Sequence, residues 1–205
     1  MMRAGVGVAI AQQITAEEPL LYYMIDILES AGVSNVTEQF VALILIGVAK
    51  VAVILTTGYL FDVYGRKTLL CSSNIGIGFS LLIMAIVSDH IPGLAFAALV
   101  IYVVSFSAGM GPGCWLTISE IFPSEIRARA VSVCTVCNRI TALILTVSFL
   151  SFKDAAGSAG CYGVFMIFAV MNVLFIMKYL PETKGVSLEQ ISRLFDQELR
   201  IWPGR

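Results

Sequence analysis

The sequence predicts an all-α membrane protein with six transmembrane helices. Of its 205 residues, 58% are hydrophobic and only 13% are charged, whereas a soluble domain has roughly 25% charged residues. Apolar runs long enough to cross a bilayer, about 20 residues each, recur near residues 4–27, 39–61, 68–88, 93–117, 130–151 and 161–180. We therefore expect a six-helix transmembrane bundle over residues 1–181 and a cytoplasmic tail over residues 182–205.

The basic residues orient the predicted spans. Lys and Arg gather in the short cytoplasmic loops of membrane proteins. When alternate loops are compared here, one side of the membrane has only one basic residue, Lys153. The outward connections are then near residues 28–38, 89–92 and 152–160, and both termini are expected in the cytoplasm. The basic residues on the cytoplasmic side are Arg3, Arg66, Lys67, Arg127, Arg129, Lys178, Lys184, Arg193, Arg200 and Arg205.

The first span carries polar groups within its apolar run. Gln12 and Gln13 fall near its middle, where an unpaired amide is costly. Such amides either hydrogen-bond to neighbouring helices or face a polar ligand. Tyr22 and Tyr23 approach the outer end, where residues of an aromatic belt are the alternative interpretation.

The second span contains a charge, Lys50, and ends in a short turn. Intramembrane charges are usually paired or face a wet cavity, so we hypothesise an ion pair between Lys50 and Glu18 of the first span. The alternative is that Lys50 extends toward one membrane surface. The turn Asp62-Val63-Tyr64-Gly65-Arg66-Lys67 joins the second and third spans, and its glycine permits the tight connection.

The fourth span is interrupted by Gly109-Met110-Gly111-Pro112-Gly113-Cys114-Trp115. Three glycines and a proline let a membrane helix bend or unwind where it lines a cavity. The following connection mixes Glu120 and Glu125 with Arg127 and Arg129. This mixture indicates an ion-pair network at the cytoplasmic face.

The fifth span contains Asn138 and Arg139, and the sixth ends at Pro181-Glu182-Thr183-Lys184-Gly185, where proline stops a helix. In the tail, Ser187-Leu188-Glu189-Gln190 is a capping box. Apolar residues then recur at helical spacing, which predicts an amphipathic helix on the membrane face or under the bundle. A partner-binding helix is the alternative.

Composition and motifs argue against several classes of function. The five cysteines fall within or at the edge of spans, where cysteine behaves as a small hydrophobe. The sequence offers no nucleophile–base constellation, metal cluster or phosphate loop. We therefore expect no enzyme activity, no cofactor, no metal and no nucleic-acid partner.

Together these motifs resemble the sugar porter family of the major facilitator superfamily, in its monosaccharide and proton-symporter-like subgroup. The family carries an acid-x-x-Gly-Arg-Arg/Lys turn, a Trp followed by Ser-Glu-Ile-Phe-Pro and Arg-x-Arg, and a final Pro-Glu-Thr-Lys-Gly. A Gln-Gln pair followed by Tyr-Tyr matches the seventh of the twelve family helices. The match runs from about residue 5 to 200, and it covers the second half of a family member.

The resemblance implies roles for individual residues. Substrate-binding positions are Gln12, Gln13, Glu18, Lys50, Trp115 and Asn138; for Trp115, anchoring at the interface is the alternative. Tyr22 and Tyr23 would form an outer gate, and a cytoplasmic gate would comprise Asp62, Arg66, Glu120, Arg127 and Glu182. Static anchoring is the alternative to a gate.

The sequence also departs from the family pattern. The family Gly-Ile-Asn after Gln-Gln is Ala16-Glu17-Glu18 here, so an acid replaces an amide. Arg139 stands where many members have an aromatic residue, and Ala142 replaces a second Asn. The expected pocket is therefore altered.

We expect transport of a monosaccharide (hexose, pentose or polyol) by alternating access, with the chain acting as the C-terminal half of a carrier. It would lie in a lipid bilayer, in the plasma membrane or a vacuolar membrane, and pair with an N-terminal six-helix half or a second chain. Proton symport and facilitated diffusion both remain open. The alternative is a non-transporting sugar sensor or regulatory membrane protein.

Overall fold

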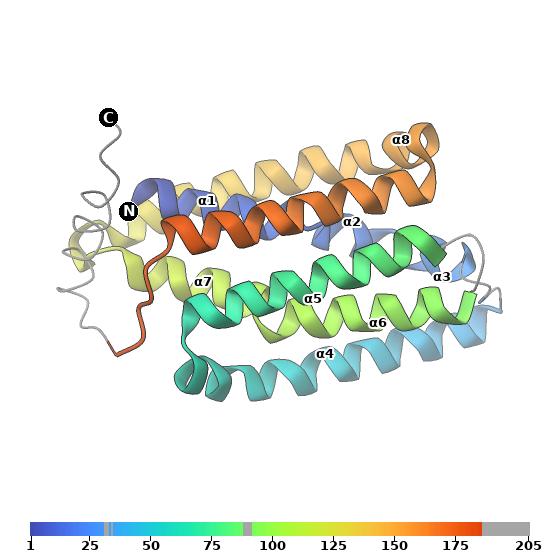
Figure 1. Cartoon of the computed structure of the whole chain (residues 1–205), viewed down its shortest axis with the longest axis horizontal. Coiled ribbons are helices and arrows are strands. Elements are labelled where there is room, and N and C mark those ends of the chain that lie inside the picture. The colour runs from blue at the N-terminus through green and yellow to red at the C-terminus, as the bar shows by residue number, and fades with distance from the viewer. Residues whose placement is uncertain (31–32, 34, 88–91, 186–205) are drawn as a thin grey trace.

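The computed structural model describes residues 1–30, 33, 35–87 and 92–185, and within these ranges the regular structure is helical. The helices lie side by side along one long axis (Figure 1). In chain order they are α1 (Met2–Gln13), α2 (Glu17–Tyr22), α3 (Met24–Ser30), α4 (Val36–Tyr64), α5 (Arg66–Val87), α6 (Pro92–Ala108), α7 (Met110–Ile121) and α8 (Ser124–Tyr179).

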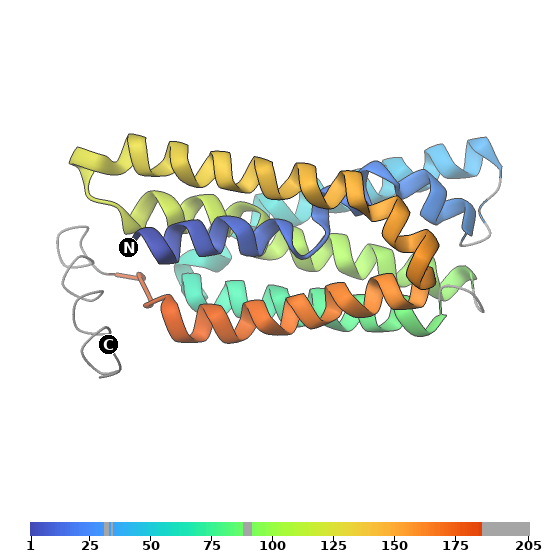
Figure 2. The same ribbon diagram turned by 90° about the horizontal axis from the view of Figure 1, so that it is seen from above.

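The chain passes along the bundle six times within the described residues. Four stretches are long and apolar enough to cross a membrane: α4, α5, residues 93–121 and α8. The 56-residue α8 holds two passes, because Gly157 has φ 72° and ψ 167° inside it, and Figure 2 shows its two arms running in opposite directions. The three consecutive short helices α1, α2 and α3 together make the remaining pass. The six-helix expectation is confirmed, but the connection expected near 152–160 is a single-residue reversal at Gly157.

The first pass is broken, although the sequence predicted one span over 4–27. α1 ends at Gln13, and Ala16 has a left-handed conformation with φ 72°. Backbone groups freed by the break find partners: Thr15 Oγ1 donates to the Gln12 carbonyl at 2.6 Å, and the Tyr102 hydroxyl donates to the Thr15 carbonyl at 3.1 Å. These hydrogen bonds replace helical ones inside a region that excludes water.

The fourth pass breaks where its glycines predicted an interruption, between α6 and α7. Gly109 is the non-helical residue, with φ −150° and ψ −70°. The Ser73 hydroxyl of α5 accepts the Met110 N–H at 2.9 Å and donates to the Ser105 carbonyl at 2.7 Å. Pro112 falls in the first turn of α7, where a missing N–H is tolerated.

Polar side chains tie α1 to both arms of α8. Asn138 on the first arm donates to the Ala9 carbonyl and Asn172 on the second arm donates to the Ala11 carbonyl, each at 2.8 Å. On the second arm, Ala169 also faces Gly78 of α5. The breaks of both irregular passes are thus held by neighbouring helices.

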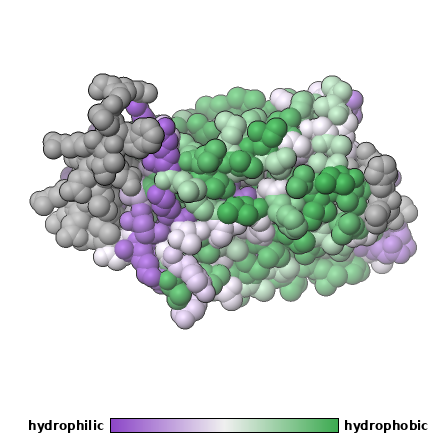
Figure 3. All heavy atoms as spheres, viewed as in Figure 1, coloured by the Kyte–Doolittle hydropathy of each residue, from purple (hydrophilic) through white to green (hydrophobic). Residues whose placement is uncertain are grey.

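The outer face of the bundle is apolar. Of the 29 residues of α4, only Ala42, Ile46, Thr57 and Phe61 are buried, and Leu55 is 79% exposed. Figure 3 shows hydrophobic side chains covering the middle of the visible face, with hydrophilic ones gathered toward its two ends. An exposed apolar belt of this kind fits contact with lipid, and the chain is an integral, multi-pass membrane protein. The amphipathic helix predicted after Ser187 lies outside the described residues.

Candidate functional site

A cavity of about 340 Å³ lies between the helices, beside both breaks. This volume is within the usual range for small-molecule sites. Its walls combine amide, charged, aromatic and backbone-exposing residues: Gln12, Glu17, Glu18, Lys50, Ile54, Phe106, Ser107, Gly111, Pro112, Trp115 and Arg139. Of the predicted binding residues, Gln12, Glu18, Lys50 and Trp115 line this cavity.

Gln13 and Asn138 lie behind the cavity wall, where both are fully buried. Gln13 Nε2 donates to Asn138 Oδ1 at 3.1 Å, and Asn138 Nδ2 donates to Gln12 Oε1 at 2.9 Å. Gln12 Nε2 then donates to the Gly111 carbonyl at 3.0 Å. This chain of amides crosses from α1 to α8 and α7, so it fixes the orientation of Gln12 in the cavity.

Two ion pairs flank the cavity, and they correct the hypothesised pairing. Lys50 Nζ lies 3.7 Å from Glu17 Oε1, while Arg139 Nη1 lies 2.7 Å from Glu18 Oε1. The predicted Glu18–Lys50 pair is therefore wrong. The break at Ala16 turns α2 away from the line of α1, so Glu17 faces α4 and Glu18 faces α8.

The two predicted outer-gate tyrosines have different surroundings. Tyr22 is 70% exposed. Tyr23 stacks on Phe149 of α8, with ring centroids 5.3 Å apart and planes inclined by 16°. Of the two tyrosines, Tyr23 is the one that stacks on a neighbouring helix in the described part of the chain.

Sequence reasoning missed Glu17 and Ser107 as cavity residues. Glu17 is adjacent to Glu18, which the sequence did predict as a binding residue. Two acids in a row within an apolar span could have pointed to Glu17 as well. Ser107 is 1% exposed and its hydroxyl has no hydrogen-bond partner in the described part of the chain. A lone serine in an apolar span gives no sequence signal.

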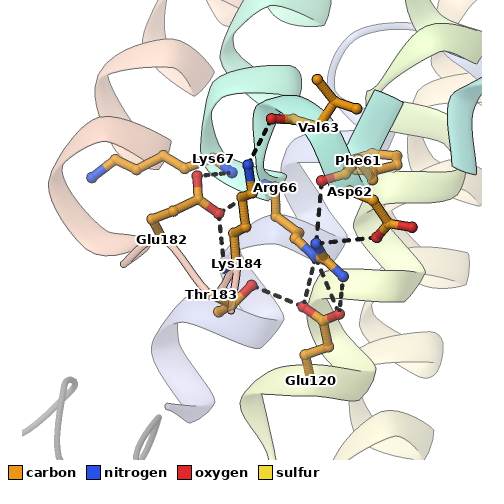
Figure 4. Close-up of polar contacts among 9 residues, drawn as sticks. All are labelled: Phe61, Asp62, Val63, Arg66, Lys67, Glu120, Glu182, Thr183 and Lys184. Atoms are coloured by element: carbon orange, nitrogen blue, oxygen red, sulfur yellow. Dashed lines mark hydrogen bonds and ion pairs between the residues drawn. The ribbon is translucent and has the colours of Figure 1, made fainter. Parts of the chain in front are cut away.

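A second polar cluster forms at the opposite end from α3, around the α4–α5 turn (Figure 4). Arg66 Nη2 contacts Glu120 Oε1 at 2.9 Å, and Arg66 Nε lies 3.2 Å from each oxygen of the same carboxylate. Thr183 Oγ1 donates to Glu120 Oε2 at 2.8 Å. The cluster thus joins α5, α7 and the segment after α8.

Glu182 caps the start of α5 from a distant part of the chain. Its carboxylate accepts the backbone N–H groups of Arg66 at 2.8 Å and Lys67 at 3.1 Å. An acid placed at a helix N-terminus is favoured by the free N–H groups and the helix dipole. Gly65 makes this approach feasible: its φ is 87°, and a Cβ there would lie 2.7 Å from Glu182 Oε2.

The other two predicted gate residues contribute less to this cluster. Asp62 lies 3.6 Å from Arg66 Nη1, and its side chain is 76% exposed, so this pair is weak. Arg127 donates instead to the Phe122 carbonyl at 3.1 Å. The described part of the cluster therefore centres on Arg66, Glu120 and Glu182.

The fold and the cavity define a class: an integral membrane half-bundle of the major facilitator type, with broken helices around a polar cavity. The chain belongs to the sugar transporter family, because the family model described as "Sugar (and other) transporter" matches residues 1–195. Among curated relatives, "Probable polyol transporter 4" of Arabidopsis thaliana is 37% identical over 95% of this chain. "D-xylose-proton symporter-like 3, chloroplastic" of the same plant is 34% identical over 91% of this chain.

Solved structures show the same architecture. The inward-open conformation of the xylose transporter XylE from E. coli superposes with a TM-score of 0.83 and 26% identity, over 94% of this chain and 41% of that chain. A XylE double-tryptophan mutant gives a TM-score of 0.88 at 25% identity, over 95% of this chain and 42% of that one. The chain spans 38% of the first relative's length and 34% of the second's.

Proposed function

We propose that this chain forms the C-terminal half of a carrier that moves a monosaccharide across a membrane by alternating access. The observation that supports this most strongly is the cavity at the two helix breaks, lined by Gln12, Trp115 and exposed backbone of α7. Carriers of this type bind substrate where discontinuous helices line a central site between two halves. The family and the names of its relatives support a sugar or polyol as the cargo.

The cavity chemistry fits a polyhydroxylated ring. Gln12 has an amide oxygen that accepts hydrogen bonds and an amide nitrogen that donates them. Trp115 provides a flat apolar face for the C–H surface of a sugar. Gln13 and Asn138 hold Gln12 in place rather than lining the cavity, so we assign them a positioning role.

The cluster of Arg66, Glu120 and Glu182 would act as the cytoplasmic gate. It links α5, α7 and the segment after α8 by charged contacts, which can have two discrete arrangements in an alternating-access cycle. The basic residues that share this end, including Lys67 and Lys184, support a cytoplasmic orientation. We propose that both termini lie on this side, in the plasma membrane or a vacuolar membrane.

A second half would close the open side of the cavity. The relatives are more than twice as long as this chain, and an N-terminal six-helix half or a second chain would supply the missing wall. The proton is a second proposed cargo, since relatives include proteins named proton symporters.

Equilibrium binding tests the proposal. The chain is purified in lipid nanodiscs together with the N-terminal portion of the Arabidopsis polyol transporter that it does not match. Binding of labelled D-glucose, D-xylose and D-sorbitol is then measured. We expect saturable binding of at least one ligand and a loss of about tenfold in affinity for Gln12→Ala and Trp115→Ala.

The matched control is Gln39→Ala, because Gln39 bonds the Val33 carbonyl near the start of α4 and away from the cavity. Unchanged binding in Gln12→Ala and Trp115→Ala would refute the assignment of the cavity.

A sugar sensor or regulator is the second candidate, favoured by the Glu18–Arg139 ion pair that occupies the cavity wall. A sensor would bind sugar without moving it. Binding together with an absence of counterflow, with both halves present in vesicles, would favour this candidate.

A further inference from the structure

The charged groups around the cavity are unequally exposed. In the Lys50–Glu17 pair the side chains are 35% and 18% exposed, and in the Arg139–Glu18 pair they are 55% and 14% exposed. In each pair the base is therefore more accessible than the acid. Although the four charges sum to zero, the cations present more accessible surface than the acids.

The two cations also retain unused hydrogen-bond donors. Lys50 Nζ is 3.7 Å from Glu17 Oε1, which is longer than an ordinary N–H···O hydrogen bond. Arg139 donates hydrogen bonds from Nε and Nη2 to Asn138 Oδ1 and from Nη1 to Glu18 Oε1. Each of the two terminal nitrogens uses one hydrogen in this way. Each terminal nitrogen of a guanidinium carries two hydrogens, so one on each has no partner among the described residues.

A third donor is buried in the same wall. Ser107 lines the cavity at 1% exposure, and its hydroxyl has no hydrogen-bond partner in the described ranges. A buried hydroxyl without a partner is unfavourable. Ser107 is thus a polar group in the cavity wall whose burial is not compensated by a hydrogen bond among the described residues.

Resting on the proposed function, we infer that the cavity takes a monosaccharide that bears a carboxylate, of the uronic or aldonic acid class. Lys50 and Arg139 receive the carboxylate through charge-assisted hydrogen bonds, which are stronger than neutral ones. Gln12 and Trp115 contact the hydroxylated remainder. Glu17 and Glu18 hold the cations in place and limit the added negative charge, so a monoanion is preferred over a phosphate dianion.

The competing explanation is that the ion pairs only brace the break between α1 and α2. The two explanations differ in their consequences for ligands. If the ion pairs are only a brace, losing them lowers the affinity for every ligand equally, because a brace acts through the fold. Loss of a carboxylate site weakens binding of the anionic ligand more than binding of its neutral analogue.

The test compares D-glucuronate with D-glucuronamide, which has nearly the same shape without the charge, and with D-glucose and glucose 6-phosphate. Binding is followed by the fluorescence of Trp115 in a Trp202→Phe background, with the chain and an N-terminal half in nanodiscs. We expect D-glucuronate to bind at least tenfold more tightly than D-glucuronamide. Lys50→Gln should reduce this preference to about twofold or less, because D-glucuronate should lose more affinity than D-glucuronamide.

Two variants control for charge and folding. Lys153→Gln removes a cation near the Gly157 turn and should keep the full preference. Lys50→Arg keeps the cation and should retain most of it. The comparison of D-glucuronate with D-glucuronamide uses the unmodified chain. It can therefore refute the inference even if Lys50→Gln fails to fold.

The outcomes separate the inference from the proposed function. Equal binding of D-glucuronate and D-glucuronamide, or tighter binding of glucose 6-phosphate than of D-glucuronate, would overturn the carboxylate site while the sugar-binding cavity stands. An equal loss of all ligands in Lys50→Gln would favour the brace and overturn the site. Absence of binding by every ligand, with both halves folded, would overturn both.

Discussion

Ala16 has a backbone conformation that alanine rarely adopts. It is fully buried, with φ 72°, and it joins α1 to α2. A left-handed conformation is unfavourable for a residue with a Cβ by about 1–2 kcal/mol. Strain of this kind concentrates where structure is tied to function, and here it lies next to the cavity residues Glu17 and Glu18.

Replacing Ala16 by glycine should therefore stabilise the chain. We expect the free energy of unfolding of Ala16→Gly to rise by about 1 kcal/mol, because glycine adopts positive φ without penalty. Reversible unfolding in detergent micelles, followed by circular dichroism, measures the change. The control Ala11→Gly, within α1, should lower stability by about 1 kcal/mol; a loss in both variants would contradict the strain.

At the scale of single residues, the sequence indicated which residues line the cavity better than it indicated their ion-pair partners. Gln12, Glu18, Lys50 and Trp115 were predicted near a common site, and they line one cavity. The partner of Lys50 was missed because the prediction assumed one straight span over 4–27. Alanine at position 16, unlike glycine, gives no warning of a left-handed break.

The break between α6 and α7 depends on a side chain from another helix. Ser73 on α5 accepts the Met110 N–H and donates to the Ser105 carbonyl, so it satisfies backbone groups on both sides of Gly109. The irregular segment is thereby held in one conformation beside the cavity.

Removing this hydroxyl should loosen the break. Ser73→Ala leaves a buried N–H unsatisfied, and we expect a loss of about 1–3 kcal/mol in unfolding free energy. Hydrogen exchange at the Met110 amide should accelerate as well. Ser72→Ala removes a hydroxyl that bonds only the Leu69 carbonyl of its own helix, and it should change neither quantity by much. Equal effects of the two variants would count against the capping role of Ser73.

The N-terminus of α5 depends on the distant acid Glu182. Glu182→Ala removes the acceptor for two backbone N–H groups, so we expect a loss of about 1–2 kcal/mol in stability. The matched variant is Asp154→Ala, which removes an exposed acid that lies outside the first turn of a helix and should alter stability by less than about 0.5 kcal/mol. Thermal unfolding in micelles compares them. A neutral Glu182→Ala would show that the cap contributes nothing.

The elements themselves were largely predictable, because apolar runs report membrane spans directly. The break at Gly109 was predicted from its glycines and proline. The reversal at Gly157 was expected as a longer connection, near residues 152–160. The structure continues helix to either side of one glycine instead.

At the scale of the whole molecule, Arg66 and Glu120 connect separate passes at one end of the bundle. We expect a coupling free energy of about 1–3 kcal/mol between them in a double-mutant cycle with Arg66→Gln and Glu120→Gln. Unfolding of the two single variants and the double variant gives this value. Strictly additive losses would show that the contact carries no energy of its own and would weaken its proposed role as a gate.

The six-pass half-bundle and its family were both predictable from motifs that are far apart in the sequence but occur in a fixed order. Which surface the proposed second half would cover was not predictable, because its contacts would lie outside this chain. The cavity between α1, α4, α7 and α8 is accordingly lined by partly exposed charges, such as Lys50 and Arg139.

Counterflow of labelled sugar into vesicles tests most directly whether the chain is one half of a carrier. Vesicles contain the chain alone, the N-terminal portion of the Arabidopsis relative alone, or both, and are loaded with unlabelled D-glucose, D-xylose, D-sorbitol or D-glucuronate. We expect label to accumulate only when both parts are present, and Gln12→Ala and Trp115→Ala to reduce the accumulation sharply. No counterflow of any sugar from both correctly inserted parts, or counterflow that is indifferent to these cavity residues, would contradict this expectation.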